Sequence, residues 1–530
     1  MNQLAHRLQL LSQRDHQHVL QHLVRGIEKE SLRVTPDGRL AQTPHPEALG
    51  AAMTHPEITT DYSEALLEFI TPALPSVTDV LRRLDLLHRY TYRHIGDELL
   101  WVNSMPCVLE DESSIPLARY GSSNVGRMKT LYREGLGHRY GRLMQTIAGI
   151  HYNFSVSDEL WQLLHQESAS TLSLQNFKTE GYFGLIRNFR RYFWLLLYLF
   201  GAAPAVCRSF VAGRTHRLEP VGSDPHSLHT PHATSLRMGD LGYQSAVQEQ
   251  LVVNYNDLGS YITTLRDALR NPHPDYTRIG VRGEDGEYRQ LSDHLLQIEN
   301  EFYSTVRPKR NSQAGETPLR TLWERGVEYV EVRCLDLNPY LPLGIDETQI
   351  RFLDTFLILC LLRDSPATNC EEYRHINTNQ ALLVYEGRDP KLKLHTLDGE
   401  RPLRDWGTEL FDQLAAVAEL IDSAQGGQRH RDAVAAFLPH LTDADLTPSA
   451  RVIQDMRSNG DSYFSFALKT AEQHRDHFLH GELDPIEARK YAILARESLA
   501  TQQAIEAADE ISFDEYLTDY YRQYDFSLEP

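Results

Sequence analysis

The sequence predicts an α+β protein whose strands lie mostly in the first part of the chain. Short runs rich in β-branched and aromatic residues alternate irregularly with helical patterns up to Asp346, and the chain beyond is mostly helical. No internal repeat, low-complexity tract or long linker divides it. We therefore expect a main body at residues 1–400 and a helical C-terminal part at residues 401–530, packed together as one unit.

The N-terminal region begins with a helical pattern, which is followed by a predicted β-hairpin. Residues 25–34 (RGIEKESLRV) are the first strand-like run, residues 36–38 (Pro-Asp-Gly) are a turn signal, and residues 39–43 are the second run. Residues 58–72 are again rich in β-branched and aromatic side chains, whereas residues 78–99 have helical periodicity.

The middle of the chain contains two further predicted strands. Residues 144–156 alternate at period two, and residues 326–339 are typical of a buried strand that ends in a turn. Helices fill the space between them and carry the most apolar run, residues 192–206. This run is shorter than the roughly 20 residues of a bilayer span and contains Gly201 and Pro204, so we expect a buried core helix.

The composition excludes several classes of protein. Apolar residues make up 41% of the chain and charged residues 24%, as in ordinary globular proteins, which argues against disorder and against a membrane protein. A formal charge of −20 opposes nucleic-acid binding, because a phosphate backbone attracts basic surfaces. The N-terminus lacks the apolar core of a signal peptide. We therefore expect a cytoplasmic protein without a nucleic-acid or membrane partner.

The cysteine pattern is consistent with a reduced setting. The five residues contain no Cys-x-x-Cys pair and none of the spacings of a zinc finger. They are Cys107, Cys207, Cys334, Cys360 and Cys370. The simplest interpretation is that they are thiols in the cytosol.

Charged side chains inside predicted strands are the feature that indicates a site. Such residues are depleted in strands, and a carboxylate that faces the interior must be paired or bound to a metal. Because side chains two apart on a strand share a face, Glu28 and Glu30 project together, as do Glu331 and Arg333. The ligand-type groups on these separate strands are Glu28, Glu30, Glu68, His151, Asn153 and Glu331.

Convergence of these groups would require a cation. Carboxylates about 5 Å apart would repel by roughly 3 kcal/mol per pair at an effective dielectric constant of about 20. Oxygen ligands favour Mg²⁺, and Mn²⁺ is tolerated with His151 as a nitrogen ligand. Taken singly, Glu28 and Glu30 fit a solvated strand face and Glu68 a buried salt bridge. A lone His151 is more often a hydrogen-bonded structural residue, so only the combination favours a metal site.

Basic residues accompany these carboxylates. Cations, together with bound metal, stabilise the charge on a phosphoryl group during its transfer. The candidates for phosphate or ATP binding are Arg127, Lys129, Arg133 and Arg310, and Arg237, Arg307, Lys309 and Arg333 are also present. Surface solubility explains many such residues equally well, but Arg333 lies in a predicted buried strand. No Walker-type loop or dinucleotide fingerprint occurs, so any nucleotide is held in another way.

Several sequence blocks follow one another between Arg25 and Gly344. They include RGIEKESLRV, ITTDYSEALLEFITP, RYGRLMQTIAGIHYNFS, ATSLRMGDLGY and GVEYVEVRCLDLNP. Through these blocks the chain resembles the glutamate-cysteine ligase family of proteobacterial type. The resemblance implies a glutamine-synthetase-like fold, in which a curved, mainly antiparallel sheet forms a funnel-shaped active site. It also implies ATP-dependent joining of the γ-carboxylate of L-glutamate to the amine of L-cysteine through γ-glutamyl phosphate, the first step of glutathione biosynthesis.

The resemblance further implies roles for individual residues. The metal-ligand positions of the family match Glu28, Glu30, Glu68, His151 and Glu331. Arg333 matches an arginine that contacts the transferred phosphoryl group, and we expect it to be catalytic together with Glu331. The cysteine pocket maps onto Tyr62, Tyr132, Leu136, Gln145, Arg237, Tyr243 and Tyr303. Feedback inhibition by glutathione is a further expectation.

Two alternatives to this function stay open from the sequence. One is a related carboxylate-amine ligase that uses another amine, which a panel of amines would distinguish. The other is a non-catalytic protein that binds a metal or an amino acid without forming ADP. The phosphate-type cations beside the carboxylates argue against the second alternative, because simple binding does not require them.

Overall fold

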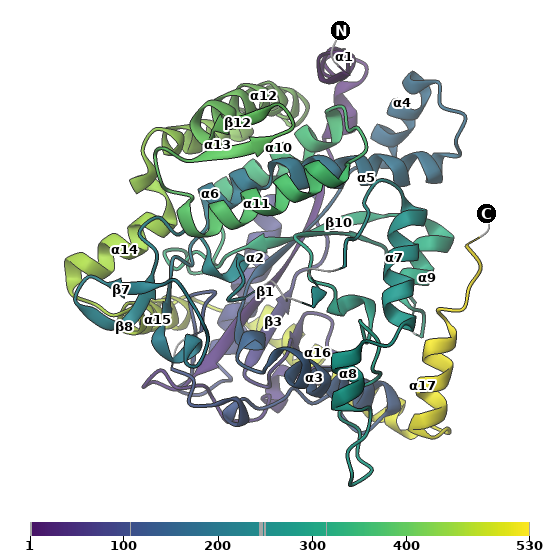
Figure 1. The fold of residues 1–530 in the computed structure, drawn as a ribbon, viewed down its shortest axis with the longest axis vertical. Helices are drawn as coiled ribbons and strands as arrows, with labels where there is room; N and C mark the ends of the chain where they lie inside the picture. The colour runs from purple at the N-terminus through teal and green to yellow at the C-terminus, as the bar shows by residue number, and fades with distance from the viewer. Residues whose placement is uncertain (1–2, 107, 243–246, 249–250, 314, 529–530) are drawn as a thin grey trace.

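The structure is a computed structural model that describes residues 3–106, 108–242, 247–248, 251–313 and 315–528. One large antiparallel sheet lies among many helices, which confirms the predicted α+β class (Figure 1). The strands of this sheet are β1 Val24–Val34, β2 Ile58–Thr60, β3 Leu66–Ile70, β4 Leu99–Leu100, β5 Ile150–Ser155, β9 Val306–Lys309 and β10 Tyr329–Leu335. Their order is β2-β3-β1-β5-β10-β9, and β4 pairs with the end of β1.

Helices make up most of the rest of the chain. Those before residue 400 are α1 Gln3–Leu11, α2 Val77–Tyr92, α3 Asn124–Tyr140, α4 Asp158–Ser168, α5 Leu174–Tyr192, α6 Trp194–Phe200, α7 Leu258–Arg270, α8 Pro274–Ile279, α9 Pro318–Arg325, α10 Glu347–Leu362 and α11 Cys370–Glu386. The later helices are α12 Leu403–Gln425, α13 Arg429–Phe437, α14 Pro448–Asn459, α15 Tyr463–His480, α16 Pro485–Ala507 and α17 Phe513–Arg522. Two small antiparallel sheets consist of β6 Ala205–Cys207, β7 Glu219–Val221 and β8 Asp224–His229, and of β11 Lys393–Thr396 and β12 Gly399–Pro402.

The long strand β1 separates a helix-covered face of the sheet from an open face. Side chains on a strand alternate between the two faces. On the covered face, the guanidinium of Arg25 pairs with Asp354 of α10 at 3.1 Å, and the ammonium of Lys29 lies 2.7 Å from Nε2 of His88 in α2. Glu28 and Glu30 of β1 point to the open face. Packing of the helices on the covered face therefore fixes which side chains of β1 lie on the open face.

Helix α10 is the most completely buried of the long helices. Every residue from 349 to 362 is buried, including Asp354, whose carboxylate is paired with Arg25. Asp346 caps its first turn by accepting a hydrogen bond from the Gln349 amide at 2.8 Å. Helices α12 and α13 pack outside α10, and α15 and α16 pack against α2 (Figure 1). The late helices thus contact the main body, and the division at residue 400 stays a prediction.

The predicted N-terminal hairpin forms only in part. The turn is present, with Gly38 at φ +78°, but the second arm is reduced to a single bridge between Val34 and Leu40. Beyond this bridge, the guanidinium of Arg33 donates a hydrogen bond to the Thr43 carbonyl at 2.8 Å. A buried side chain therefore replaces the backbone ladder that the pattern predicted.

Other element boundaries differ from those predicted. The strand expected from residue 144 starts only at Ile150, because a 3₁₀ turn occupies Met144–Thr146. Helix α2 ends at Tyr92, and Leu99 instead belongs to β4. The apolar run was predicted correctly as core, since all residues of α6 are buried. Among the described residues, no helix combines the length and the apolar content that a bilayer crossing needs.

The cysteines differ in state. Cys334 and Cys360 are buried free thiols and Cys370 is an exposed one. Cys207, at the end of β6, is disulfide-bonded, so the prediction of five thiols is wrong for this residue. Spacing along the chain could not reveal this, because a disulfide depends on which sulfur atoms meet in space.

Candidate active site

The register of the large sheet brings the predicted metal ligands side by side. Glu28 on β1 lies directly opposite His151 on β5, and Glu30 on β1 lies opposite Glu68 on β3. Strand β10 adds Glu331 on the other side of β5. Opposite residues of an antiparallel pair share a face, with Cβ atoms about 4.5–5.5 Å apart. The open face therefore carries a compact group of carboxylates around one imidazole.

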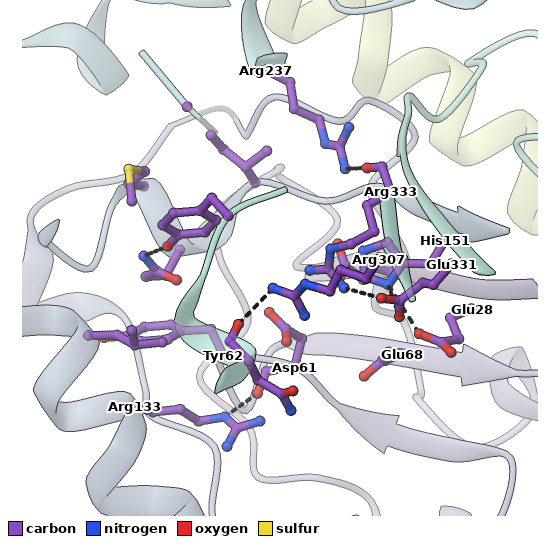
Figure 2. Close-up of a pocket in the computed structure, with 18 of the residues that line it drawn as sticks. Glu28, Asp61, Tyr62, Glu68, Arg133, His151, Arg237, Arg307, Glu331 and Arg333 are labelled. Carbon is purple, nitrogen blue, oxygen red and sulfur yellow. Dashed lines mark hydrogen bonds and ion pairs between the residues drawn. The ribbon is translucent and has the colours of Figure 1, made fainter. Parts of the chain in front are cut away.

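His151 lies at the centre of this group (Figure 2). Its Nδ1 is 3.1 Å from Oε2 of Glu28 and 3.9 Å from Oε1 of Glu331, while its Nε2 is 3.7 Å from Oε1 of Glu30. The ligand atoms of two sets lie within 4.8 Å of one another: Glu28, His151 and Glu331, and Glu30, Glu68 and His151. Two carboxylates and an imidazole fit Mg²⁺ or Mn²⁺.

Burial and neighbouring charges set the protonation of these carboxyl groups. Burial raises the pKa of Glu68 well above its usual value, and the nearby charge of Glu28 adds to the effect. Burial also acts to raise the pKa of Glu331, but the positive charges of Lys309 and Arg333 outweigh it and hold that pKa well below the usual value. The pKa values of these two neighbouring carboxyl groups are thus shifted in opposite directions, and a bound divalent cation would favour the ionised form of both.

Basic side chains adjoin the carboxylates. Nζ of Lys309 is 3.5 Å from Oε1 of Glu331, and a guanidinium nitrogen of Arg333 is 3.2 Å from Oε2 of the same residue. Arg307 is the cross-strand partner of Glu331 in β9 and donates to the carbonyl of Asn300 at 2.9 Å. Ammonium and guanidinium groups so arranged are suited to phosphate oxygens.

Arg237 lies over the beginning of β5. Its guanidinium donates to the Arg333 carbonyl at 2.9 Å and is 3.7 Å from a carboxylate oxygen of Asp336. This position requires a glycine at 149, because a Cβ there would lie 2.0 Å from Nη2 of Arg237. The amide of Gly149 also donates to Oε2 of Glu30 at 2.7 Å. One glycine therefore contacts both a predicted metal ligand and a predicted substrate-binding cation.

All these groups line one cavity of about 270 Å³. The rest of its wall combines three tyrosine rings with aliphatic and polar side chains, and we refer to it as the aromatic wall; there the Tyr303 hydroxyl accepts a hydrogen bond from Nε2 of Gln145 at 2.8 Å. The predicted cysteine-pocket residues that line the cavity are Tyr62, Tyr132, Leu136, Gln145, Arg237 and Tyr303. The remaining predicted residue, Tyr243, lies outside the described part of the chain.

Only one of the four predicted phosphate-binding cations reaches the cavity wall, namely Arg133. Arg127 is exposed and lies over an aromatic ring of α17. Nζ of Lys129 lies 5.4 Å from the ring centre of Tyr120, and burial lowers the pKa of this lysine to about 8. Arg310 donates to backbone carbonyls at the end of α9. The structure therefore does not bring these last three side chains into the site.

The sequence-based assignment omitted some lining residues. Asp61 follows β2 and lines the cavity beside Tyr62. Arg307 and Lys309 share the face of β9 that lies beside Glu331. The sequence identified both as accompanying cations but favoured Arg310 as the phosphate candidate, and their period-two spacing was the signal that could have favoured them instead. Nothing in the local pattern around Asp61 distinguishes it from a loop aspartate.

These features define a class of protein before any comparison is made. Carboxylates and an imidazole that fit divalent cations, with lysine and arginine beside them in one cavity, are the equipment of metal-dependent phosphoryl-transfer enzymes. Here the cavity wall also contains tyrosines and the buried arginine Arg237, which suits a small substrate that carries a carboxylate.

Comparisons with known proteins narrow this class. A sequence model described as glutamate-cysteine ligase matches residues 8–383. The chain is 50% identical to the glutamate-cysteine ligase of Alcanivorax borkumensis, over 98% of this chain and 100% of the relative. It is 52% identical to that of Saccharophagus degradans, over 96% of each protein. Its structure is similar to the crystal structure of the Francisella tularensis glutamate-cysteine ligase in complex with AMP, with a TM-score of 0.89, 38% identity, and coverage of 94% of this chain and 98% of that one.

The chain belongs to the glutamate-cysteine ligase family. It is an enzyme of glutathione biosynthesis that uses ATP to join the γ-carboxylate of glutamate to the amine of cysteine. The match to a relative of known structure also confirms the predicted fold. A bifunctional glutathione synthetase from Pasteurella multocida shares this fold, with a TM-score of 0.73 over 94% of this chain and 58% of that one.

Proposed function

We propose that the open face of the sheet is the catalytic centre and that its carboxylates bind Mg²⁺, with Mn²⁺ as a substitute. The proposed ligands are Glu28, Glu30, Glu68, His151 and Glu331. When bound, the cation would neutralise and orient the phosphate oxygens of ATP. The support for this proposal is the pair of ligand sets that share His151 and lie beside Lys309 and Arg333 in one cavity.

The first chemical step would take place beside the basic side chains. A γ-carboxylate oxygen of glutamate attacks the γ-phosphorus of ATP, and the bond to the leaving ADP oxygen breaks. Arg333, with Lys309 and Arg307 nearby, would stabilise the charge on the transferred group. The products are γ-glutamyl phosphate and ADP. Phosphorylation activates the γ-carboxylate, which would otherwise not react with an amine.

The second step would use the aromatic side of the cavity. The cysteine amine attacks the acyl carbon of γ-glutamyl phosphate, and inorganic phosphate leaves. Asp61 is the lining carboxylate that belongs to neither ligand set, so we assign it to accept the amine proton. Arg237 would bind a substrate carboxylate, and the wall around Tyr303 would contact the thiol side chain.

Product formation by the purified protein tests this proposal. The protein is incubated with Mg²⁺, ATP, glutamate and cysteine, each omitted in turn, while ADP release and product mass are measured. We expect a γ-glutamylcysteine mass that depends on all four components. A preference for another amine would overturn the assignment of the aromatic wall to cysteine. Absence of turnover by the folded, metal-supplied protein would contradict the proposal.

Glutathione feedback and a cytoplasmic location complete the proposal. Glutathione contains the γ-glutamylcysteine unit that this cavity would bind, so we expect inhibition that weakens as glutamate is raised. Cysteine is kept as a reduced thiol in the cytosol. Initial rates at several glutathione and glutamate concentrations test the first point, and fractionation of cells tests the second.

A further inference from the structure

Helix α17 packs against α3, although the two helices lie far apart in the sequence (Figure 1). Phe513 and Leu517 of this helix share a small apolar cluster with Met128 of α3 and Leu291. Helix α3 carries three residues of the cavity wall, Tyr132, Arg133 and Leu136, so α17 supports that wall from behind. The residues that follow α17 continue along the same side of the molecule.

Two tyrosines, Tyr521 at the end of α17 and Tyr524 just after it, contact the chain segment 297–303. The hydroxyl of Tyr524 donates to Oε2 of Glu299 at 2.5 Å, and the hydroxyl of Tyr521 donates to the carbonyl of Gln297 at 3.0 Å. Tyr524 is 1% exposed and Glu299 is 8% exposed. A hydrogen bond to a buried carboxylate is among the stronger ones, and loss of the donor leaves a charge without its partner.

Segment 297–303 forms part of the cavity wall. Asn300 and Tyr303 line the cavity; Asn300 lies between Glu299 and Glu301, and the amide of Tyr303 donates to Oε1 of Gln248 at 2.9 Å. Glu299 also accepts from the amide of Leu319 at 2.9 Å, and Glu301 accepts from a guanidinium nitrogen of Arg139 at 2.9 Å. The segment contains only a short 3₁₀ turn, so side-chain contacts rather than a ladder hold it.

Lys309, Arg333 and the predicted metal ligands take no part in these contacts, whereas Arg307 does, because its guanidinium donates to the carbonyls of Asn300 and Phe302. The ligands and these cations stand on β1, β3, β5, β9 and β10, which backbone hydrogen bonds of one sheet hold in register. Loss of an α17 contact should therefore move the aromatic wall and leave the carboxylate cluster in place. Arg307 is the described link between segment 297–303 and the phosphate side, so a change in the aromatic wall should leave the metal ligands unperturbed.

We propose that Tyr524 is a positioning residue for the amine substrate: through Glu299 it holds segment 297–303, and thereby Tyr303, in the shape that binds cysteine. The proposal rests on the assignment of the aromatic wall to cysteine made above. The proposal gives α17 and the residues that follow it a role in substrate affinity in addition to their packing.

The variant Tyr524→Phe tests this role, because it removes one hydroxyl and keeps the ring. We expect the KM for cysteine to rise about tenfold, as for loss of a hydrogen bond to a charged group, with kcat and the KM values for ATP and glutamate within about twofold. Tyr516→Phe is the matched control, since Tyr516 lies on α17, which directly precedes Tyr524, and its hydroxyl has no hydrogen-bond partner among the described residues. If Tyr524→Phe does not fold, Tyr521→Phe should produce a smaller change in the same direction.

The variant Glu299→Gln and the double variant show whether the two residues act as a pair. We expect the increase in the cysteine KM to be less than multiplicative in the double variant. An unchanged cysteine KM in Tyr524→Phe, or equal increases for all three substrates together with a lower Tm, would overturn the proposal. Failure of the unmodified protein to make γ-glutamylcysteine would contradict the proposed function itself, which distinguishes the two cases.

Discussion

His151 lies between Glu28 and Glu30, with Nδ1 3.1 Å from Oε2 of the first and Nε2 3.7 Å from Oε1 of the second. Both ring nitrogens are therefore directed at carboxylates, and both ligand sets use the same imidazole. A cation in either set would be coupled to the other through this ring. Changes to one ligand should thus affect the whole cluster, which makes single substitutions informative.

Replacement of Glu331 by glutamine should abolish most turnover without unfolding the protein. The substitution keeps the shape of the side chain but removes the negative charge that Lys309 and Arg333 face, and it weakens one ligand set. We expect kcat to fall by about 10²-fold or more, with a higher KM for ATP. Steady-state kinetics and Mn²⁺ binding measured by electron paramagnetic resonance check both effects.

The control for this variant is Glu328→Gln, which removes an exposed carboxylate just before β10. This control should keep near wild-type kinetics. If Glu331→Gln also retains wild-type activity, the assigned centre is not the site of the reaction. Arg333→Ala should behave like Glu331→Gln, since the guanidinium would stabilise the transferred phosphoryl group.

An alanine at position 149 should damage substrate binding through a purely steric effect. Its Cβ would lie 2.0 Å from Nη2 of Arg237, so this buried guanidinium must move. We expect a large increase in KM for the substrate whose carboxylate Arg237 binds. Because the amide of residue 149 also donates to Glu30, any shift of Glu30 should lower kcat as well. Gly184→Ala is the matched control, because its Cβ would have only ordinary contacts beginning at 3.6 Å. Equal kinetics in both variants would exclude a role for Arg237 at this position.

Removal of the Asp61 carboxylate should affect the second chemical step. In Asp61→Asn the amine would lose its proton acceptor, and we expect kcat for γ-glutamylcysteine formation to fall by about 10²-fold. Formation of γ-glutamyl phosphate should persist, and rapid-quench trapping of this intermediate would show it accumulating. Simultaneous loss of the intermediate and of the product would instead assign Asp61 to binding or to the first step.

The sequence predicted the acidic side of the site better than the basic side. Period-two spacing places Glu28 and Glu30, or Glu331 and Arg333, on one face whatever the tertiary structure, provided that the segment is a strand. Which face is buried, and which strands become neighbours, depends on long-range pairing such as that of Glu30 with Glu68. That information came from the family resemblance and was not contained in local patterns.

The basic residues show why local patterns fail. Arg127 and Arg133 both lie on α3, yet one is exposed and the other lines the cavity. The rotation of α3 about its axis decides which of its side chains face the cavity. The weak amphipathicity of this helix does not indicate which face is buried. Similarly, the run around Arg310 looks like a phosphate site, but this side chain satisfies the carbonyl groups at the end of α9.

His55 should make the stability of the protein dependent on pH. It is 5% exposed, and its Nδ1 accepts hydrogen bonds from the amides of Glu57 at 3.1 Å and Ile58 at 2.9 Å. Burial, with a smaller effect from the charge of Arg83, lowers the pKa of His55 to about 4. The ring is therefore neutral in the folded protein, and a proton on Nδ1 would break both bonds.

Because the pKa of His55 is lower in the folded protein than the value of about 6.5 in the unfolded chain, its contribution to stability is complete above pH 6.5 and declines as the pH falls toward 4. We expect a loss of about 1 kcal/mol between pH 7.5 and 5.5 from this residue. His55→Ala should be less stable than wild type at pH 7.5, and the difference should shrink by about that amount at pH 5.5. Urea denaturation at both pH values measures it, with His22→Ala as an exposed control. A difference that stays constant over this range would show that the pKa of His55 is the same in the folded and the unfolded protein, which would contradict this prediction.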